Sequence, residues 1–124
     1  KWASQIIGVS SEYKDPLLGR EFRALHALGR PSKYPKMTSS PSAWQSLTAD
    51  NPDGEFLLVG FDTTMAVKQI AIFENSGAGS IASVDGLDQN NNIYPIRTFF
   101  AGYNLSGSQV TTIKLPTKTT FNQL

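Results

Sequence analysis

Residues 55–61 read Glu-Phe-Leu-Leu-Val-Gly-Phe, and residues 65–73 read Met-Ala-Val-Lys-Gln-Ile-Ala-Ile-Phe. The first stretch is a continuous apolar run, which is typical of a strand that is covered on both faces. The second stretch predicts another strand, and the Asp-Thr-Thr sequence at residues 62–64 predicts a turn between them. We therefore expect two adjacent antiparallel strands and a core that contains Trp44, Phe56, Leu58, Val67, Ile70 and Ile72.

Further short strands are predicted on both sides of this pair, at residues 1–7, 81–87, 93–100 and 109–115. The Asp-Gln-Asn-Asn-Asn run at residues 88–92 predicts the polar tip of a hairpin, because these residue types tolerate left-handed turn conformations. In the last strand Thr111, Ile113 and Leu115 fall on one face. The succession of short strands and turns predicts an all-β sandwich.

One short helix is predicted in the N-terminal half, at residues 16–28. Asp15 suits the N-cap, and Pro16 suits the first helical position. Apolar residues recur at spacings of four and three, at Leu18, Phe22, Leu25 and Leu28. Gly29 and Pro31 follow this pattern, so we expect the helix to end there.

Length and composition restrict the classes of function. A chain of 124 residues with 40% apolar and 17% charged residues predicts one folded domain over residues 1–124. The formal charge of +1 lacks the positive field that phosphate binding requires, so we expect no nucleic-acid partner. The chain has no cysteine and a single histidine, which excludes thiolate zinc sites and makes a Ser-His-Asp triad hard to assemble. We therefore expect a protein that is not an enzyme, with no catalytic and no metal-binding residues.

The longest apolar runs and the first residue of the sequence indicate whether the chain crosses a membrane and whether it is processed. No apolar run approaches the roughly 20 residues that a membrane-spanning helix needs. The sequence begins at Lys1 without an initiating Met or a signal peptide, so we expect either a processed form or a piece excised from a larger protein.

The central stretch also carries a family resemblance. Ala43-Trp44, a polar spacer, residues 55–61 and residues 65–70 together resemble the discoidin family, the coagulation factor 5/8 C-type domains. Ser10-Ser11-x-Tyr13 and residues 24–29 are similar to the opening segment of that family. The resemblance implies a galactose-binding-like jelly-roll sandwich with ligand loops at one end. The chain departs from it in lacking cysteines and in having Gly60 where the family strand has Asp.

A narrower resemblance concerns discoidin-like domains of bacterial envelope proteins, some of them joined to peptidoglycan-anchoring modules of the OmpA type. Leu28-Gly29-Arg30-Pro31 and Asn75-Ser76-Gly77-Ala78 match short motifs of these domains. This resemblance implies a location in the bacterial cell envelope or outside the cell. It also implies contact with other domains of the same parent protein.

The candidate ligand-binding residues are Tyr13, Arg30, Lys33 and Tyr34. The resemblance implies ligand contacts near residues 13–18 and 33–41, where an exposed aromatic ring stacks on a sugar and a guanidinium binds a carboxylate or sulfate. The leading hypothesis is a non-catalytic recognition module for a glycan or a cell-surface ligand. The alternative is a structural or protein-docking domain of an envelope assembly. A glycan site requires exposed aromatic rings clustered with polar groups, whereas a docking domain requires a flat apolar patch.

Three other features have simpler interpretations. Asp50, Asp53 and Glu55 lie in or beside the turn sequence Asn-Pro-Asp-Gly, which explains them without a glycosidase mechanism. The spacing of Asp85 and Asp88 does not match an EF-hand, so we expect no cofactor, although a structural calcium elsewhere is left open. The pair Leu17-Leu18 resembles a lipid-inserting loop of some relatives, but Leu18 also fits the helix pattern, so we expect no membrane insertion.

Overall fold

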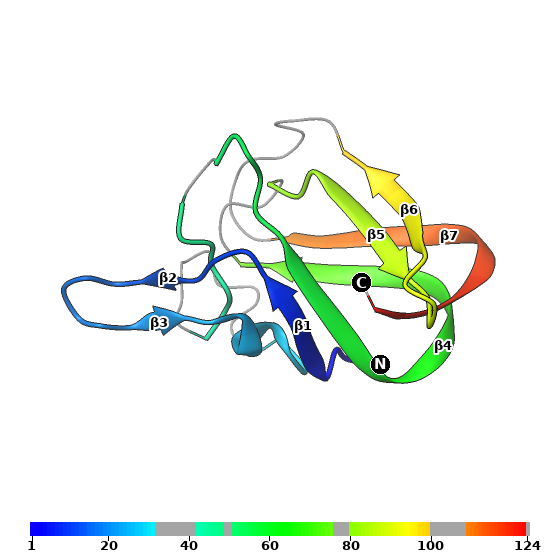
Figure 1. Cartoon of the computed structure of the whole chain (residues 1–124), viewed down its shortest axis with the longest axis horizontal. Coiled ribbons are helices and arrows are strands. Elements are labelled where there is room, and N and C mark those ends of the chain that lie inside the picture. The colour runs from blue at the N-terminus through cyan, green and yellow to red at the C-terminus, as the bar shows by residue number, and fades with distance from the viewer. Residues whose placement is uncertain (32–41, 49–50, 76–79, 100–108, 124) are drawn as a thin grey trace. The chain divides into compact units, whose positions relative to one another are not determined.

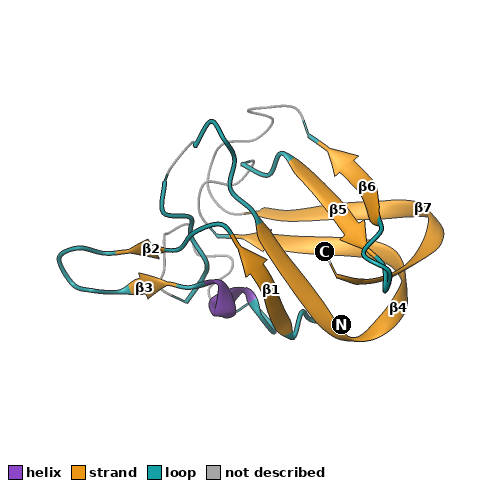
Figure 2. Cartoon of the chain, viewed as in Figure 1, coloured by secondary structure: helices purple, strands orange, loops and turns teal. Residues whose placement is uncertain are grey.

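The structure, a computed structural model, describes residues 1–31, 42–48, 51–75, 80–99 and 109–123 (Figure 1). These residues are mostly strand, which confirms the predicted all-β class (Figure 2). The elements in chain order are β1 (Gln5–Val9), β2 (Tyr13–Lys14), β3 (Glu21–Phe22), the 3-10 helix η1 (Ala24–Ala27), β4 (Leu57–Glu74), β5 (Ser83–Leu87), β6 (Ile93–Thr98) and β7 (Gln109–Gln123).

The described residues divide into two compact units, the first formed by residues 1–31, 42–48 and 51–62 and the second by residues 63–75, 80–99 and 109–123. In the first unit β1 pairs with the first part of β4, and β2 pairs with β3. In the second unit the hydrogen-bonded order is β4, β7, β5, β6. Each pairing with a known register is antiparallel.

The predicted turn at residues 62–64 is wrong, and so is the predicted pair of strands around it. Both stretches belong to one continuous strand, β4. Asp62 favours turns, but the β-branched residues Thr63 and Thr64 favour a strand and the tripeptide has neither Gly nor Pro, so the strand continues through it. The boundary between the two units nevertheless falls between Asp62 and Thr63.

The predicted helix at residues 16–28 is also wrong. Its first half is the loop of the β2–β3 hairpin, and its second half contains only η1. Gly19 has φ +69°, a left-handed conformation that ends any helix, and its N–H donates to the Asp15 carbonyl at 2.8 Å. The Asp15 N–H then donates to the Arg20 carbonyl at 2.8 Å, which closes the hairpin. No helix in the described part of the chain has the length and apolarity for crossing a bilayer.

The hairpin predicted around residues 88–92 is confirmed. β5 and β6 are antiparallel neighbours, and Leu87 pairs with Ile93 across the tip. Asn91 has φ +62°, which Asn tolerates better than most residues. Pro95 lies in β6, at the end of the strand order, where a missing N–H costs least.

Each unit has a small set of buried side chains. Phe22 and Ala24 are buried in the first unit, and Ile70, Thr111 and Ile113 in the second. The predicted inward face of the last strand is thus confirmed at Thr111 and Ile113, and Leu115 is half-buried. Of the other core residues predicted, Ile70 is confirmed, whereas Trp44, Leu58, Val67 and Ile72 are half-buried.

Phe56 was predicted in the core, and that prediction is wrong, because its side chain is 57% exposed. It precedes β4 by one residue, beyond the part of the chain that β1 covers. Its ring atom Cε2 lies 3.5 Å from the point where a Cβ on Gly8 would stand. The ring therefore lies over backbone that has no side chain.

Candidate functional site: a hairpin tip and an apolar strand face

Two of the four predicted ligand-binding residues are described, and they occupy different environments. Tyr13 is half-buried in β2, and its ring packs against Phe22 with centroids 5.3 Å apart. The Tyr13 N–H also donates to the Gln45 carbonyl at 2.8 Å. Tyr13 therefore stabilises the first unit and offers little ring surface to a ligand.

Arg30 is exposed, and the structure does not bring it to Tyr13. It follows Gly29, which has φ +74° and whose N–H donates to the Ala3 carbonyl at 3.0 Å. No hydrogen bond or ring contact joins Arg30 to Tyr13 within the described residues. Lys33 and Tyr34 lie outside the described residues. That these four residues form one ligand-binding site therefore stays a prediction.

The loop of the β2–β3 hairpin presents two leucines to solvent. Leu17 is 91% exposed and Leu18 is 72% exposed. They lie at the far end of the hairpin, which extends away from β1 and η1 (Figure 1). We refer to Leu17 and Leu18 as the leucine tip.

One carboxylate fixes the backbone of the leucine tip. Asp15 Oδ1 accepts hydrogen bonds from the N–H groups of Leu17 at 2.9 Å and Leu18 at 3.2 Å. Asp15 Oδ2 pairs with Arg20 Nη2 at 2.9 Å. The Arg20 hydrogen bond, followed by those from the two backbone N–H groups, holds the pKa of Asp15 below its usual value of 3.8. The N-cap role expected of Asp15 thus serves a turn instead of a helix.

A second exposed apolar surface lies on the β1–β4 pair. A β-bulge between Ile6 and Gly8 inserts Ile7 as an extra residue. A Cβ on Gly60 would stand 3.1 Å from Ile7 Cδ1, so the Ile7 side chain lies over Gly60. Gly60 is two residues from Leu58, so both are on one face of β4. Ile7 therefore belongs to the same face as Leu58, and so does the polar residue Gln5, whose Cβ lies 3.5 Å from the point where a Cβ on Gly60 would stand.

Phe56 completes this surface. A Cβ on Gly8 would contact both Phe56 Cε2 at 3.5 Å and Leu58 Cβ at 3.9 Å. We refer to Ile7, Phe56 and Leu58, with Gly8 and Gly60 beneath them, as the β1–β4 face. Ile7 is exposed like Phe56, and Leu58 is half-buried.

Serine side chains hold Phe56 and its neighbours in place. Ser10 Oγ accepts from the Phe56 N–H at 2.9 Å and donates to the Phe56 carbonyl at 3.2 Å. Ser11 Oγ donates to Glu55 Oε1 and accepts from the Leu47 N–H at 2.9 Å. These contacts fix the chain at the start of β4, so the position of the Phe56 backbone is rigidly defined.

The Asn51–Gly54 turn was predicted, and it supports Glu55. The Gly54 N–H donates to the Asn51 carbonyl at 3.0 Å, and Gly54 has φ +81°. Asn51 Nδ2 also donates to Glu55 Oε2 at 3.4 Å. Glu55 thus accepts hydrogen bonds on both carboxylate oxygens, which gives it a structural role.

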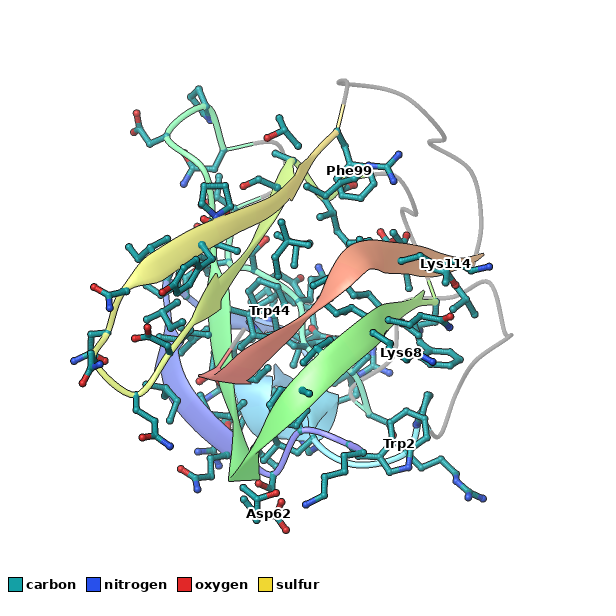
Figure 3. All side chains as sticks on the ribbon, turned by 90° about the vertical axis from the view of Figure 1, so that its right-hand side faces the viewer. Trp2, Trp44, Asp62, Lys68, Phe99 and Lys114 are labelled. Carbon is teal, nitrogen blue, oxygen red and sulfur yellow. The ribbon has the colours of Figure 1, made fainter. Side chains whose placement is uncertain are left out.

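The two tryptophans differ in their environments. Trp2 is exposed and lies at the periphery, whereas Trp44 is half-buried (Figure 3). Trp44 Nε1 donates to the Ser11 carbonyl at 2.9 Å. That hydrogen bond agrees with a packing role for Trp44.

The polar tip of the second unit is organised around Asp88. Its Oδ1 accepts from the N–H groups of Asn90 at 2.8 Å and Asn92 at 3.0 Å, and its Oδ2 accepts from Tyr94 OH at 3.0 Å. The hydrogen bonds, that of the Asn92 side chain first, lower the pKa of Asp88. The hydrogen bond that Tyr94 OH donates to Asp88, followed by the negative charge of Asp88, raises the pKa of Tyr94, because both favour the protonated phenol. The Asp88 carboxylate therefore accepts hydrogen bonds from the residues of its own turn.

The sequence did not predict the β1–β4 face. Its residues come from segments almost fifty positions apart, and the bulge that turns Ile7 onto this face has no local sequence signal. Within the described residues no three His, Cys, Asp or Glu side chains gather in a way that could hold a metal ion. Comparison of the chain with protein-family models, curated proteins and solved structures found no significant match.

Proposed function

We propose that this chain is a non-catalytic recognition module that docks onto a protein partner through the leucine tip. The observation that carries the proposal is the exposure of Leu17 and Leu18, at 91% and 72%, on a loop whose backbone N–H groups donate to Asp15, which also pairs with Arg20. Exposed leucines on a fixed backbone lose little conformational entropy on binding. They also gain the full burial of their apolar surface.

We also propose a fold family, a parent protein and a location for this chain. We propose a discoidin-like jelly-roll sandwich from a larger bacterial protein of the envelope or cell exterior. The motif resemblance supports this setting, as do the all-β class and the location of the tip in a loop close after β1. In that setting the module is a docking element of a larger assembly.

Glycan recognition is the second candidate function, and Phe56 favours it. Its ring is exposed, and Ser10 and Ser11 lie beside its backbone. An exposed aromatic ring provides the apolar face on which a sugar ring stacks. Among the described aromatic residues Phe56 replaces Tyr13 as the stacking candidate.

Retention on isolated bacterial envelopes tests both functions. The two matched variants are Leu17→Ser with Leu18→Ser, and Phe56→Ser. Docking predicts that the leucine variant loses retention, and that protease treatment of the envelopes abolishes retention of the unmodified chain. Glycan binding predicts loss with Phe56→Ser and after periodate oxidation of the envelopes.

The remaining outcomes also decide between the functions. Retention that survives protease and periodate, and that protein-free lipid vesicles reproduce, would assign the tip to a lipid surface. Equal retention of the leucine variant and the unmodified chain, with equal melting temperatures, would overturn the docking proposal.

A further inference from the structure

We infer that the Asp53–Gly54 sequence is a site of spontaneous isoaspartate formation, and that this modification loosens the start of β4. The inference is independent of docking through the leucine tip, because it concerns a covalent change in the backbone of the turn at residues 51–54. The chain also supplies an internal comparison. Asp85–Gly86 is a second Asp-Gly sequence, and it lies in β5.

The reaction needs only the two neighbouring residues and water. The amide nitrogen of Gly54 forms a bond to Cγ of the protonated Asp53 carboxyl, the Cγ–OH bond breaks, and the hydroxyl leaves with the amide proton as water. The product is a five-membered succinimide ring. Water then opens this ring at either carbonyl carbon, which restores aspartate or yields isoaspartate, whose main chain runs through Cγ. The net change in mass is zero.

The turn leaves both reacting groups of Asp53 and Gly54 accessible. Both residues are exposed, and glycine places no side chain beside the attacking nitrogen. Within the residues that the structure describes, Asp53 is bonded only through its N–H, which donates to Asn51 Oδ1 at 3.0 Å. The Gly54 N–H donates to the Asn51 carbonyl at 3.0 Å. A single hydrogen bond in an exposed turn opens readily, so the carboxyl and the nitrogen can meet.

The second Asp-Gly sequence has the same atoms in a different backbone. Asp85 pairs with Pro95 and Gly86 pairs with Tyr94, both across the β5–β6 ladder. Gly86 is also buried. The ladder holds the backbone of Asp85 extended, and ring closure requires rotation out of that conformation. We therefore expect this sequence to be protected for as long as the hairpin is folded.

Isoaspartate at residue 53 changes the support of Glu55. It adds one methylene to the main chain between Asn51 and Gly54, whose carbonyl and N–H close the turn. Glu55 follows directly and accepts from Asn51 Nδ2 at 3.4 Å and from Ser11 Oγ. Ser11 Oγ in turn accepts from the Leu47 N–H at 2.9 Å. A displaced turn therefore releases the contacts that fix the chain at the start of β4.

Prolonged incubation of the folded chain at mildly acidic pH tests the site. Trypsin cuts after Lys36, Lys68 and Arg97, so the peptides 37–68 and 69–97 contain one Asp-Gly sequence each. Fragmentation between Cα and Cβ locates isoaspartate in each peptide, and an unchanged mass distinguishes it from deamidated asparagine. We expect Asp53 to isomerise at least about tenfold faster than Asp85 in the folded chain, because local opening of a turn is easier than that of a ladder. In concentrated urea the two rates should become similar.

The effect on β4 needs a second measurement. Chromatography separates the isoaspartyl form, in which amide hydrogen exchange at Glu55 and Phe56 should be faster than in the unmodified chain, with exchange in β5 unchanged. The control is Asp53→Glu, which cannot form the five-membered ring and should keep its exchange rates after the same incubation.

The contrary results are equally defined. Equal rates at Asp53 and Asp85 in the folded chain, or a faster reaction at Asp85, would overturn the assignment of the site. Unchanged exchange at Glu55 and Phe56 in the isoaspartyl form would overturn the effect on β4. Neither result bears on envelope retention of the leucine variant, so this inference and the docking proposal fail separately.

Discussion

Asp15 and Arg20 face each other across the β2–β3 hairpin, with Arg20 Nη2 2.9 Å from Asp15 Oδ2. The same carboxylate accepts hydrogen bonds from the N–H groups of Leu17 and Leu18. One side chain therefore closes the base of the loop and fixes the two residues at its end. This relationship turns a pair of exposed leucines into a surface of defined shape.

Replacing Asp15 should loosen the leucine tip without unfolding the unit. In Asp15→Ala the N–H groups of Leu17 and Leu18 lose their acceptor, so their amide hydrogen exchange should accelerate relative to the strands. Asp53→Ala is the matched control, because Asp53 is an exposed loop aspartate whose own N–H, and not its carboxylate, makes the turn contact. Unchanged exchange at Leu17 in the Asp15 variant would contradict the role given to this carboxylate.

Phe22 and Phe56 of the first unit should differ in how much their truncation lowers the free energy of unfolding. Phe22 is buried, so Phe22→Ala should lower the free energy of unfolding by about 3–5 kcal/mol. Phe56 is largely exposed, so Phe56→Ala should lower it by less than about 1 kcal/mol. Chemical denaturation of both variants gives the comparison. Equal costs would mean that the ring of Phe56 is packed and that the β1–β4 face does not exist in this form.

The two glycines of the β1–β4 face provide a second matched pair. A Cβ on Gly60 would stand 3.1 Å from Ile7 Cδ1, closer than most Cβ contacts, whereas one on Gly8 would meet Phe56 Cε2 at an ordinary 3.5 Å. Gly60→Ala should therefore destabilise the chain more than Gly8→Ala, and thermal unfolding measures the difference. The reverse order would contradict the position of Ile7 above Gly60.

Acid should weaken the β5–β6 hairpin through Asp88. Hydrogen bonds lower the pKa of Asp88 below 3.8 in the folded chain, so folding favours its ionised form. This contribution to stability is fully present above the unfolded value of 3.8 and is lost as the pH falls through the lower folded value. The unmodified chain should therefore exceed Asp88→Asn in melting temperature at neutral pH, and the difference should shrink in acid. A difference that stays constant down to about pH 2 would contradict this linkage.

The turns at residues 51–54 and 88–92, which are rich in Asn, Asp and Gly, were predictable from the sequence, whereas the turn predicted at residues 62–64 was wrong and the long-range contacts were not predicted. The polar run at residues 88–92 predicted its hairpin because Asn and Asp side chains satisfy their own turn, as Asp88 does. The predicted helix failed because the spacing of Leu18, Phe22 and Leu25 fits one face of a helix and also fits a hairpin followed by a 3-10 turn. Gly19 decides between them by taking a left-handed conformation inside the segment.

The β1–β4 face could not be predicted from the sequence because it depends on how the residues of β1 and β4 pair. Phe56 lies in an apolar run that predicted burial, but its exposure follows from where β1 ends its pairing with β4, opposite Leu57. The bulge at Ile7 and the bond between Ser11 and Glu55, which are 44 residues apart, are decided by tertiary packing. The helix pattern at Leu18 predicts packing of this side chain, whereas both Leu17 and Leu18 are exposed in the structure.

A spin label near the leucine tip tests the docking function most directly. The chain has no cysteine, so a nitroxide on Pro16→Cys is the only thiol-linked label, and it leaves both leucines in place. We expect isolated bacterial envelopes to immobilise this label, and we expect the immobilisation to be lost when Leu17→Ser and Leu18→Ser are added to the labelled chain. A label that stays equally mobile with and without envelopes would contradict docking through the tip.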